Sequence, residues 1–162
     1  MKVLVFTITD APQDLPVMTT VERKQAQYVC CTETIPRDTE SMENTAPPEP
    51  WVRMFFKGDS DVDIDELKHN PMYLITRKDK TKSHDWILYI PPDLVLLHSP
   101  LFIVTHVATK YPNCKSFAGE GDSFRLWRSD WTSELRIERA SHDIVTNEDG
   151  ITRFFERLLL VG

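Results

Sequence analysis

The residues whose type and spacing best fit chemistry are the alternating aspartates in the run Gly-Asp-Ser-Asp-Val-Asp-Ile-Asp, residues 58–65. On a strand, Asp61 and Asp63 would point to the same face, because successive side chains alternate between faces. Two carboxylates on one face are how a two-metal phosphoryl-transfer site holds its ions. One hypothesis is therefore a metal-dependent nucleotidyl or phosphoryl transfer enzyme, or a degenerate relative, that uses Mg²⁺ or Mn²⁺ at this pair.

The surroundings of these aspartates favour a simpler interpretation. Ser60-Asp-Val-Asp-Ile resembles the aspartate motif of nucleotidyltransferases, but the Gly-Ser turn that this family carries upstream is missing here, where the chain has Pro50-Trp-Val-Arg. The run also resembles the start of a calcium loop. Ile64, however, stands where that loop needs glycine, and Asn70 replaces its closing glutamate. A solvated acidic turn is the favoured interpretation.

Histidines and cysteines complete the set of reactive side chains. His98 and His106 are two helical turns apart and could share a face, but neither a cysteine nor a carboxylate stands beside them at ligand spacing. Cys30 and Cys31 are adjacent and lack the C-x-x-C spacing of redox and zinc sites. Cys114 fits either a reactive thiol beside Lys115 or a plain surface thiol. The sequence therefore predicts no catalytic or cofactor-binding residue.

Two further groups of residues suit contact with a protein partner. A basic loop after Arg77 can grip an acidic surface, or it can simply keep the edge of a hairpin soluble. Aromatic side chains next to an arginine are typical of interfaces when exposed, and of the core when buried. The candidate interaction residues are Trp127, Arg128, Trp131, Lys78, Lys80 and Lys82.

Composition limits the class of protein. A chain of 162 residues can form one domain with a sizeable core, and its net charge of −6 argues against nucleic-acid binding. Three cysteines, two of them adjacent, make a poor disulfide framework and favour a reducing compartment, cytoplasmic or nuclear. The apolar stretch from Trp86 to Tyr111 is broken by prolines, so a membrane span is not expected.

That apolar stretch is expected to organise the fold. Strands are predicted at residues 2–9, 51–57, 72–77, 86–90, 124–127 and 133–137, because these runs are rich in β-branched and aromatic residues. Thr19 and Glu22 stand at capping-box spacing and predict a helix, with a strand over 27–32 as the competing interpretation.

Three more helices are considered. Pro92 suits the first turn of a short helix that contains Leu94, Leu97 and His98. Ser99 as N-cap and Pro100 at the first helical position suit the start of another element, yet residues 101–108 fit either a buried helix or a buried strand. The apolar spacing of residues 151–159 predicts a C-terminal helix.

Residues 32–50 have the composition of a linker, with prolines and acidic residues. We therefore expect an N-terminal strand and helix extension over residues 1–50 and a main body over 51–162. The predicted fold class is a single α+β domain with a mixed sheet and helices packed on it.

Three segments resemble BTB/POZ domains. These are Ser60-Asp-Val at a strand start, Asp93 to Phe102 as a helix that ends in Ser-Pro-Leu-Phe, and Glu148 to Gly162 as an acidic turn followed by a helix with paired aromatics. The resemblance covers residues 58–162 at most. It implies a dimerising or scaffold-recruiting module without catalysis.

The leading functional prediction is accordingly a non-enzymatic interaction or assembly protein that acts through a protein partner or self-association. The alternative is the metal-dependent transfer enzyme centred on Asp61 and Asp63.

Overall fold

The computed structural model of the chain describes residues 2–18, 21–32, 37–55, 84–93, 95–96, 98–110, 112, 116–118, 125–128, 138–139 and 145–146. Its described strands form a seven-stranded sheet of order β3-β2-β1-β4-β7-β6-β8 and a separate pair, β5 with β9. The strands are β1 (Val3–Ile8), β2 (Ala26–Thr32), β3 (Val52–Phe55), β4 (Trp86–Tyr89), β5 (Val95–Leu96), β6 (Ser116–Ala118), β7 (Arg125–Arg128), β8 (Glu138–Arg139) and β9 (Val145–Thr146). The helices are the 3-10 turn η1 (Pro12–Asp14), α1 (Thr39–Asn44) and α3 (Pro100–Lys110).

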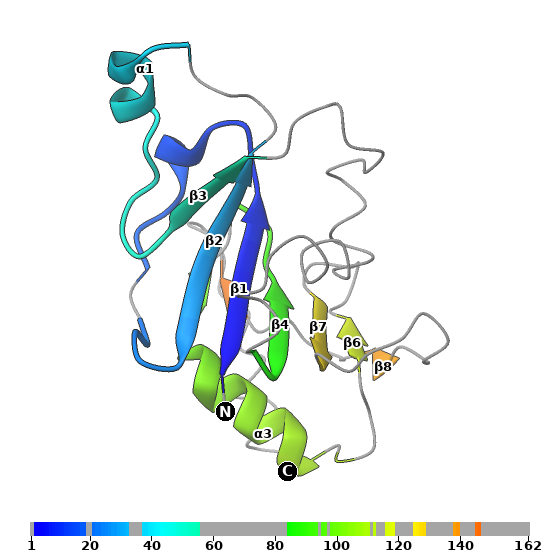
Figure 1. Cartoon of the computed structure of the whole chain (residues 1–162). Coiled ribbons are helices and arrows are strands. Elements are labelled where there is room, and N and C mark those ends of the chain that lie inside the picture. Colours follow the sequence, from blue (N-terminus) through cyan, green and yellow to red (C-terminus); the bar gives the residue numbers. More distant parts are fainter. Residues whose placement is uncertain are drawn as a thin grey trace.

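Four parallel strands make up one side of the large sheet. β1 pairs in parallel with β2 on one side and with β4 on the other, and β2 pairs in parallel with β3. β7 then runs antiparallel to β4. The strands therefore follow outward from β1 to β2 and β3, and the later strand β4 lies on the opposite side of β1 (Figure 1).

One face of the sheet carries the main hydrophobic core. Val3, Val5 and Leu88 point to this face and belong to one buried cluster with Ile103 and Val104 of α3. In Figure 1, α3 lies across the lower part of the sheet, where β1 and β4 begin. α3 is therefore anchored on the same central strands that pair with one another.

The other face is buried as well. The ring of Phe6 lies 5.2 Å from that of Tyr89 and 6.4 Å from that of Trp127, centroid to centroid. Leu4 and Ile87 are paired neighbours on this face and are fully buried. Burial of both faces explains why β1 and β4 are continuous apolar runs rather than alternating ones, as is typical of parallel strands.

The structure settles the open choice for residues 101–108. They form the α-helix α3, which begins at Pro100 as the sequence predicts. Ser99 is the N-cap, since its Oγ accepts a hydrogen bond of 3.1 Å from the backbone N–H of Phe102.

The helix predicted from Thr19 is wrong, and the competing strand is correct. Residues 26–32 form β2. The Glu22 carboxylate instead closes a turn before this strand, because it accepts hydrogen bonds from the backbone N–H groups of Lys24 (3.3 Å) and Gln25 (2.7 Å). Placement of β2 between β1 and β3 outweighed the local capping signal.

The BTB/POZ resemblance is also wrong. It requires a helix that ends in Ser99-Pro-Leu-Phe, whereas Val95 and Leu96 form the strand β5 and Ser99 caps the beginning of α3. The short helix predicted from Pro92 fails for the same reason. Two consecutive prolines follow β4, and Pro92 and Asp93 form a turn before β5.

The predicted fold class is correct in part. The sheet is mixed, but four of its strands form a parallel unit in which β1 and β2, expected in an N-terminal extension, occupy the interior. Parallel neighbours on both sides of the first strand define an α/β, Rossmann-like arrangement rather than α+β. The strands predicted near 2–9, 51–57, 86–90 and 124–127 are confirmed.

Several predicted elements lie outside the described residues. These are the aspartate run 58–65, the strands at 72–77 and 133–137, and the C-terminal helix 151–159. Within the described ranges, no helix combines the length and the apolar character that crossing a bilayer requires.

Truncation of Leu88 tests the buried centre of the sheet. Leu88 is 0% exposed, so we expect Leu88→Ala to lower the free energy of unfolding by about 2–5 kcal/mol through lost burial and an unfilled cavity. Urea denaturation followed by tryptophan fluorescence measures the change. Val17, which is 73% exposed, is the control, and Val17→Ala should leave the midpoint nearly unchanged. A small effect at Leu88 would contradict the described packing.

Substitution of Ser99 tests the start of α3. Ser99→Ala removes the cap and should destabilise the protein by about 1 kcal/mol, whereas Ser99→Asp should retain most of the stability because a carboxylate also accepts the Phe102 N–H bond. Thermal denaturation by circular dichroism compares the three proteins. Equal loss in both variants would mean that the hydroxyl does not act as an N-cap.

Candidate functional site

The chain leaves β1 through a turn that holds an aspartate at the carboxyl edge of the sheet. The Thr9 N–H donates to the Cys31 carbonyl at 3.1 Å, which extends the contact with β2 past the last paired residue. The Thr9 hydroxyl accepts a 3.1 Å hydrogen bond from the Ala11 N–H, and η1 follows directly. Leu15 behind η1 is buried in the core, so the turn is anchored at both ends while Asp10 stays exposed.

The end of β4 lies beside the end of β1. The Ile90 N–H donates to the Phe6 carbonyl at 3.1 Å, so the end of β4 stays paired with β1. Pro91 and Pro92 have no N–H groups and cannot continue the ladder. Asp93 follows and is exposed.

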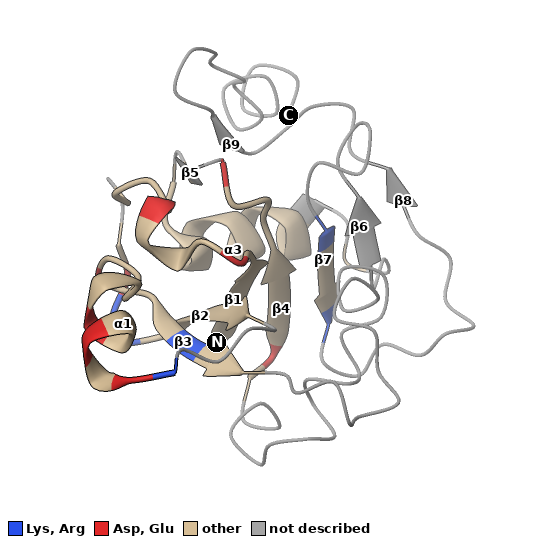
Figure 2. Cartoon of the chain, turned by 90° about the horizontal axis from the view of Figure 1, so that it is seen from above, with Lys and Arg blue, Asp and Glu red and all other residues tan. Residues whose placement is uncertain are grey.

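Both exits lie at the same edge of the sheet. The parallel ladder of β1 and β4 runs from Val3 with Trp86 to Phe6 with Tyr89, and Asp10 and Asp93 follow in the turns after it. Neighbouring strands are about 4.8 Å apart, so two carboxylates leave adjacent parallel strands at one edge. Figure 2 looks onto the molecule from this side, since β1 and β4 point upward in Figure 1.

Buried hydroxyls lie toward the same edge. Thr7 is the last but one residue of β1 and Thr32 is the last residue of β2, and both are buried. Within the part of the chain that the structure describes, the Oγ1 atom of each has no hydrogen-bond partner. A buried hydroxyl without a partner costs about 1–3 kcal/mol, a cost usually found where another requirement overrides packing.

The short helix α1 adds acidic groups beyond β2. Its N-cap is Asp38, whose Oδ1 accepts a 2.7 Å hydrogen bond from the Ser41 N–H. This backbone hydrogen bond, followed by one from the Ser41 side chain, lowers the pKa of Asp38. The acidic residues of α1 and its approach are visible in red in Figure 2.

The sequence-predicted site residues are only partly placed. Asp61, Asp63, Trp131 and the loop lysines Lys78, Lys80 and Lys82 lie outside the described residues. Trp127 is 1% exposed and packs against Phe6, as a core residue does.

Arg128 follows Trp127 on β7. Its guanidinium lies 4.5 Å from the centre of the Trp86 ring and donates to the Pro112 carbonyl at 3.3 Å. The described contacts of Arg128 are therefore internal ones, a cation–π contact and a hydrogen bond.

The histidines share a face as their spacing suggests. The Phe102 ring stacks between the two imidazoles, and its centroid lies 5.1 Å from that of the His98 ring and 6.4 Å from that of the His106 ring. Among the described residues there is no group of three or more histidine, cysteine or acidic side chains able to hold a metal ion.

Sequence reasoning missed the carboxyl edge. Asp10 belongs to none of the predicted elements or sites, and Asp93 enters only as the first residue of the helix that the BTB/POZ resemblance implies. A usable signal exists, because each aspartate stands within four residues of the end of a continuous apolar run, Val3–Phe6 or Trp86–Ile90. Polar residues directly after such runs are where parallel sheets place their ligand-binding groups.

No protein-family model and no curated protein matches this chain. A solved structure from Desulfovibrio desulfuricans G20, with a proposed assignment as a nucleotide-diphospho-sugar transferase, matches with a TM-score of 0.48 and 13% identity over 86% of this chain and 80% of that one. A likeness of this degree carries no inference about function.

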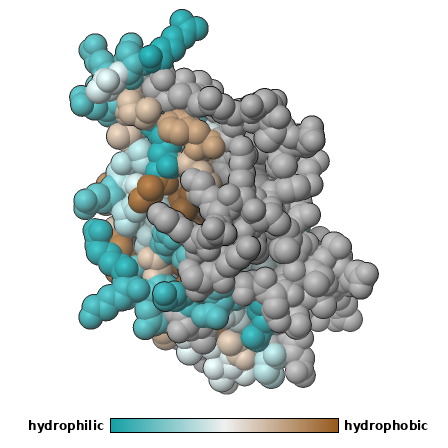
Figure 3. All heavy atoms as spheres, in the orientation of Figure 1, coloured by the Kyte–Doolittle hydropathy of each residue, from teal (hydrophilic) through white to brown (hydrophobic). Residues whose placement is uncertain are grey.

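The predicted non-enzymatic scaffold is nevertheless corrected. That prediction followed from the BTB/POZ resemblance, and the parallel unit β3-β2-β1-β4 shows a different fold. On the face in Figure 3, the described surface is mostly hydrophilic, with a small hydrophobic area.

The adjacent cysteines give a test of the buried interior near this edge. Burial raises the pKa of the Cys30 thiol to about 11, and Arg53 opposes this only in part. At pH 8 about one Cys30 thiol in a thousand is then a thiolate, the reactive form. In a Cys114→Ser variant, we expect Cys30 and Cys31 to react with a chromogenic disulfide reagent only after unfolding in guanidinium. Rapid reaction of the native protein would show that these thiols are accessible.

Proposed function

We propose that this protein is a group-transfer enzyme that binds a nucleotide donor across the carboxyl ends of β1 and β4. The donor carries the transferred group on a nucleoside diphosphate, which is the leaving group. Asp10 and Asp93 are the residues that we propose to contact it.

The supporting observation is the strand order. From β1 the chain adds strands first on one side, β2 and β3, and later on the other, β4. Where the strand order reverses, the connections that leave neighbouring parallel strands diverge, and a crevice forms outside the carboxyl ends of those strands. This place is called the switch point, and open α/β sheets bind ligands there, nucleotides above all. The exits of β1 and β4, with their two aspartates, lie there.

Carboxylates suit two tasks in such a crevice. An aspartate accepts hydrogen bonds from ribose hydroxyl groups, which orients the nucleoside. An aspartate can also hold Mg²⁺ or Mn²⁺, which offsets the charge of the diphosphate as the bond to the transferred group breaks. An acceptor hydroxyl takes that group and releases its proton.

Asp61 and Asp63 remain candidates for the metal within this proposal. Their spacing still fits a pair of metal ligands if they lie on a strand. Calorimetric titration with Mn²⁺ tests this part separately: binding that persists in the Asp61→Ala, Asp63→Ala double variant would remove the pair from the site.

Calorimetry with nucleoside diphosphates tests the main proposal. The adenosine, cytidine, guanosine and uridine diphosphates are each titrated into the protein in the presence of Mg²⁺ or Mn²⁺. We expect saturable binding of at least one, weakened about tenfold or more in Asp10→Asn and in Asp93→Asn, because each loses a charge-assisted contact.

Asp14→Asn is the matched control, since Asp14 is exposed on η1 in the same loop as Asp10. It should bind as the unaltered protein does. Failure of all four nucleotides to bind, or equal binding by all three variants, would contradict a nucleotide site at this edge.

A further inference from the structure

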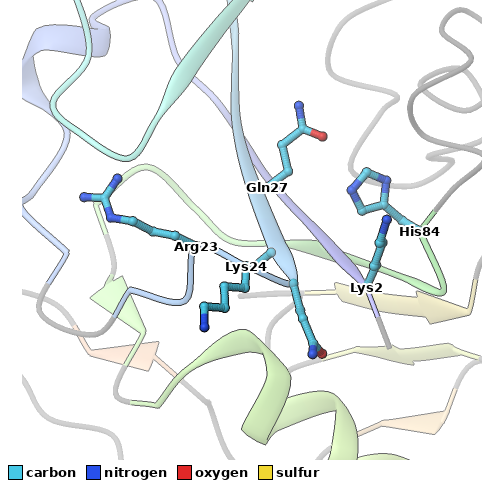
Figure 4. A pocket seen from close by; sticks show the side chains of 7 residues that line it. Lys2, Arg23, Lys24, Gln27 and His84 are labelled. Atoms are coloured by element: carbon cyan, nitrogen blue, oxygen red, sulfur yellow. The ribbon is translucent and has the colours of Figure 1, made fainter.

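A second concave site lies at the opposite, amino edge of the sheet. It is a depression of about 370 Å³ formed where β1, β2 and β4 begin. Figure 4 shows Arg23 and Lys24 on the turn before β2, and Lys2 and His84 on the segments just before β1 and β4. The full lining is Lys2, Arg23, Lys24, Gln25, Ala26, Gln27 and His84.

The charge of this lining is opposite to that of the protein. The chain has 25 acidic and 19 basic residues, yet the seven lining residues include three cations and no carboxylate. The depression is therefore a local basic site on an acidic molecule, and positive side chains around one concavity attract an anion.

Backbone hydrogen bonds hold the three segments in place. The Val3 N–H donates to the Gln25 carbonyl at 2.8 Å, and the Lys2 carbonyl accepts from Asp85 (2.8 Å) and Trp86 (3.1 Å). The cations thus come from the fixed starts of two paired strands, Lys2 before β1 and Arg23 and Lys24 before β2, rather than from an unanchored loop. Such preorganisation lowers the cost of ordering a site around a ligand.

The nearby carboxylates are directed at other donors. Glu22 binds the backbone N–H groups of Lys24 and Gln25, and the Asp85 carboxylate accepts from the Lys2 backbone N–H at 2.8 Å. Glu49 pairs with Arg23 at 3.5 Å, but both side chains are mostly exposed, so this contact is weak.

Four polar side chains of the lining are available to a ligand. In the described structure, the side chains of Lys2, Lys24, Gln25 and Gln27 make no hydrogen bond or ion pair with the protein. Ammonium and amide groups from two segments, together with the weakly paired guanidinium of Arg23, are suited to several negative oxygens at once.

We propose that this depression binds a small ligand that carries phosphate groups. Its volume lies in the range of small-molecule sites, and its donors are those that bind phosphoryl oxygens. The site is at the opposite end of the strands from the proposed nucleotide crevice, so it is a separate site and does not depend on the proposed function.

Pyrophosphate is the probe. Isothermal titration calorimetry on the full chain at constant ionic strength should show saturable binding that weakens as salt is raised. A Lys2→Gln, Lys24→Gln double variant should lose about tenfold in affinity or more. Both side chains are exposed and unbonded, so the variant should keep the melting temperature of the unaltered protein.

Two controls separate this site from others. The single variants Lys24→Gln and Arg37→Gln remove one exposed cation each, inside and outside the depression, and only the first should weaken pyrophosphate binding. Asp10→Asn should leave it unchanged.

Nucleoside diphosphates distinguish the source of the phosphate. A nucleotide that binds here loses affinity in the lysine double variant, whereas one that binds only at the carboxyl edge does not. No pyrophosphate binding, equal loss in Arg37→Gln, or loss in Asp10→Asn would each overturn the proposal.

Discussion

The structure depends on the double pairing of β1. This strand forms parallel ladders with β2 and β4 at once, and its residues are buried on both faces of the sheet, by α3 on one side and by the Phe6, Tyr89 and Trp127 rings on the other. A strand in this position has no free edge and no polar face, which is why it is made of Val, Leu and Phe. Because β2 and β3 lie on one side of β1 and the later strand β4 lies on the other, the strand order reverses at β1, and open α/β sheets have their switch point at such a reversal.

The two ends of this parallel unit differ in charge. At the carboxyl ends, Asp10 and Asp93 follow adjacent parallel strands at one edge of the sheet. At the amino ends, Lys2, Lys24 and Arg23 surround a depression without a carboxylate in its lining. Parallel strands bring like ends together, so residues far apart in the sequence become neighbours at each edge. One sheet can therefore carry two ligand sites of opposite chemistry.

The sequence predicted strands better than their arrangement. The runs at β1, β3, β4 and β7 carry enough β-branched and aromatic residues to be recognised one by one. The relative direction of the strands depends on long connections, which local sequence patterns do not report. The capping signal at Thr19 and Glu22 favoured a helix over the competing strand β2, and without β2 the parallel unit cannot be predicted. Ser99 and Pro100 marked the start of α3 correctly because an N-cap acts through its immediate neighbours.

The dependence on long-range strand pairing also explains why the sequence did not point to the aspartates at the carboxyl edge of the sheet. The sequence spacing pointed to Asp61 and Asp63, which are close in sequence, whereas Asp10 and Asp93 come to the same edge of the sheet only through the pairing of β1 with β4. Each is an ordinary aspartate in a loop when considered alone. Continuous apolar runs at Val3–Phe6 and Trp86–Ile90 could have indicated buried parallel strands, and with them the edge to inspect.

The central claim is that a nucleotide donor binds where β1 and β4 end. Amide hydrogen exchange, followed by mass spectrometry with and without the best-binding nucleoside diphosphate, measures this most directly. The account predicts slower exchange in peptides covering residues 9–14 and 90–93, with unchanged exchange in α1 at residues 39–44. Protection confined to other segments, with none at these two exits, would contradict it.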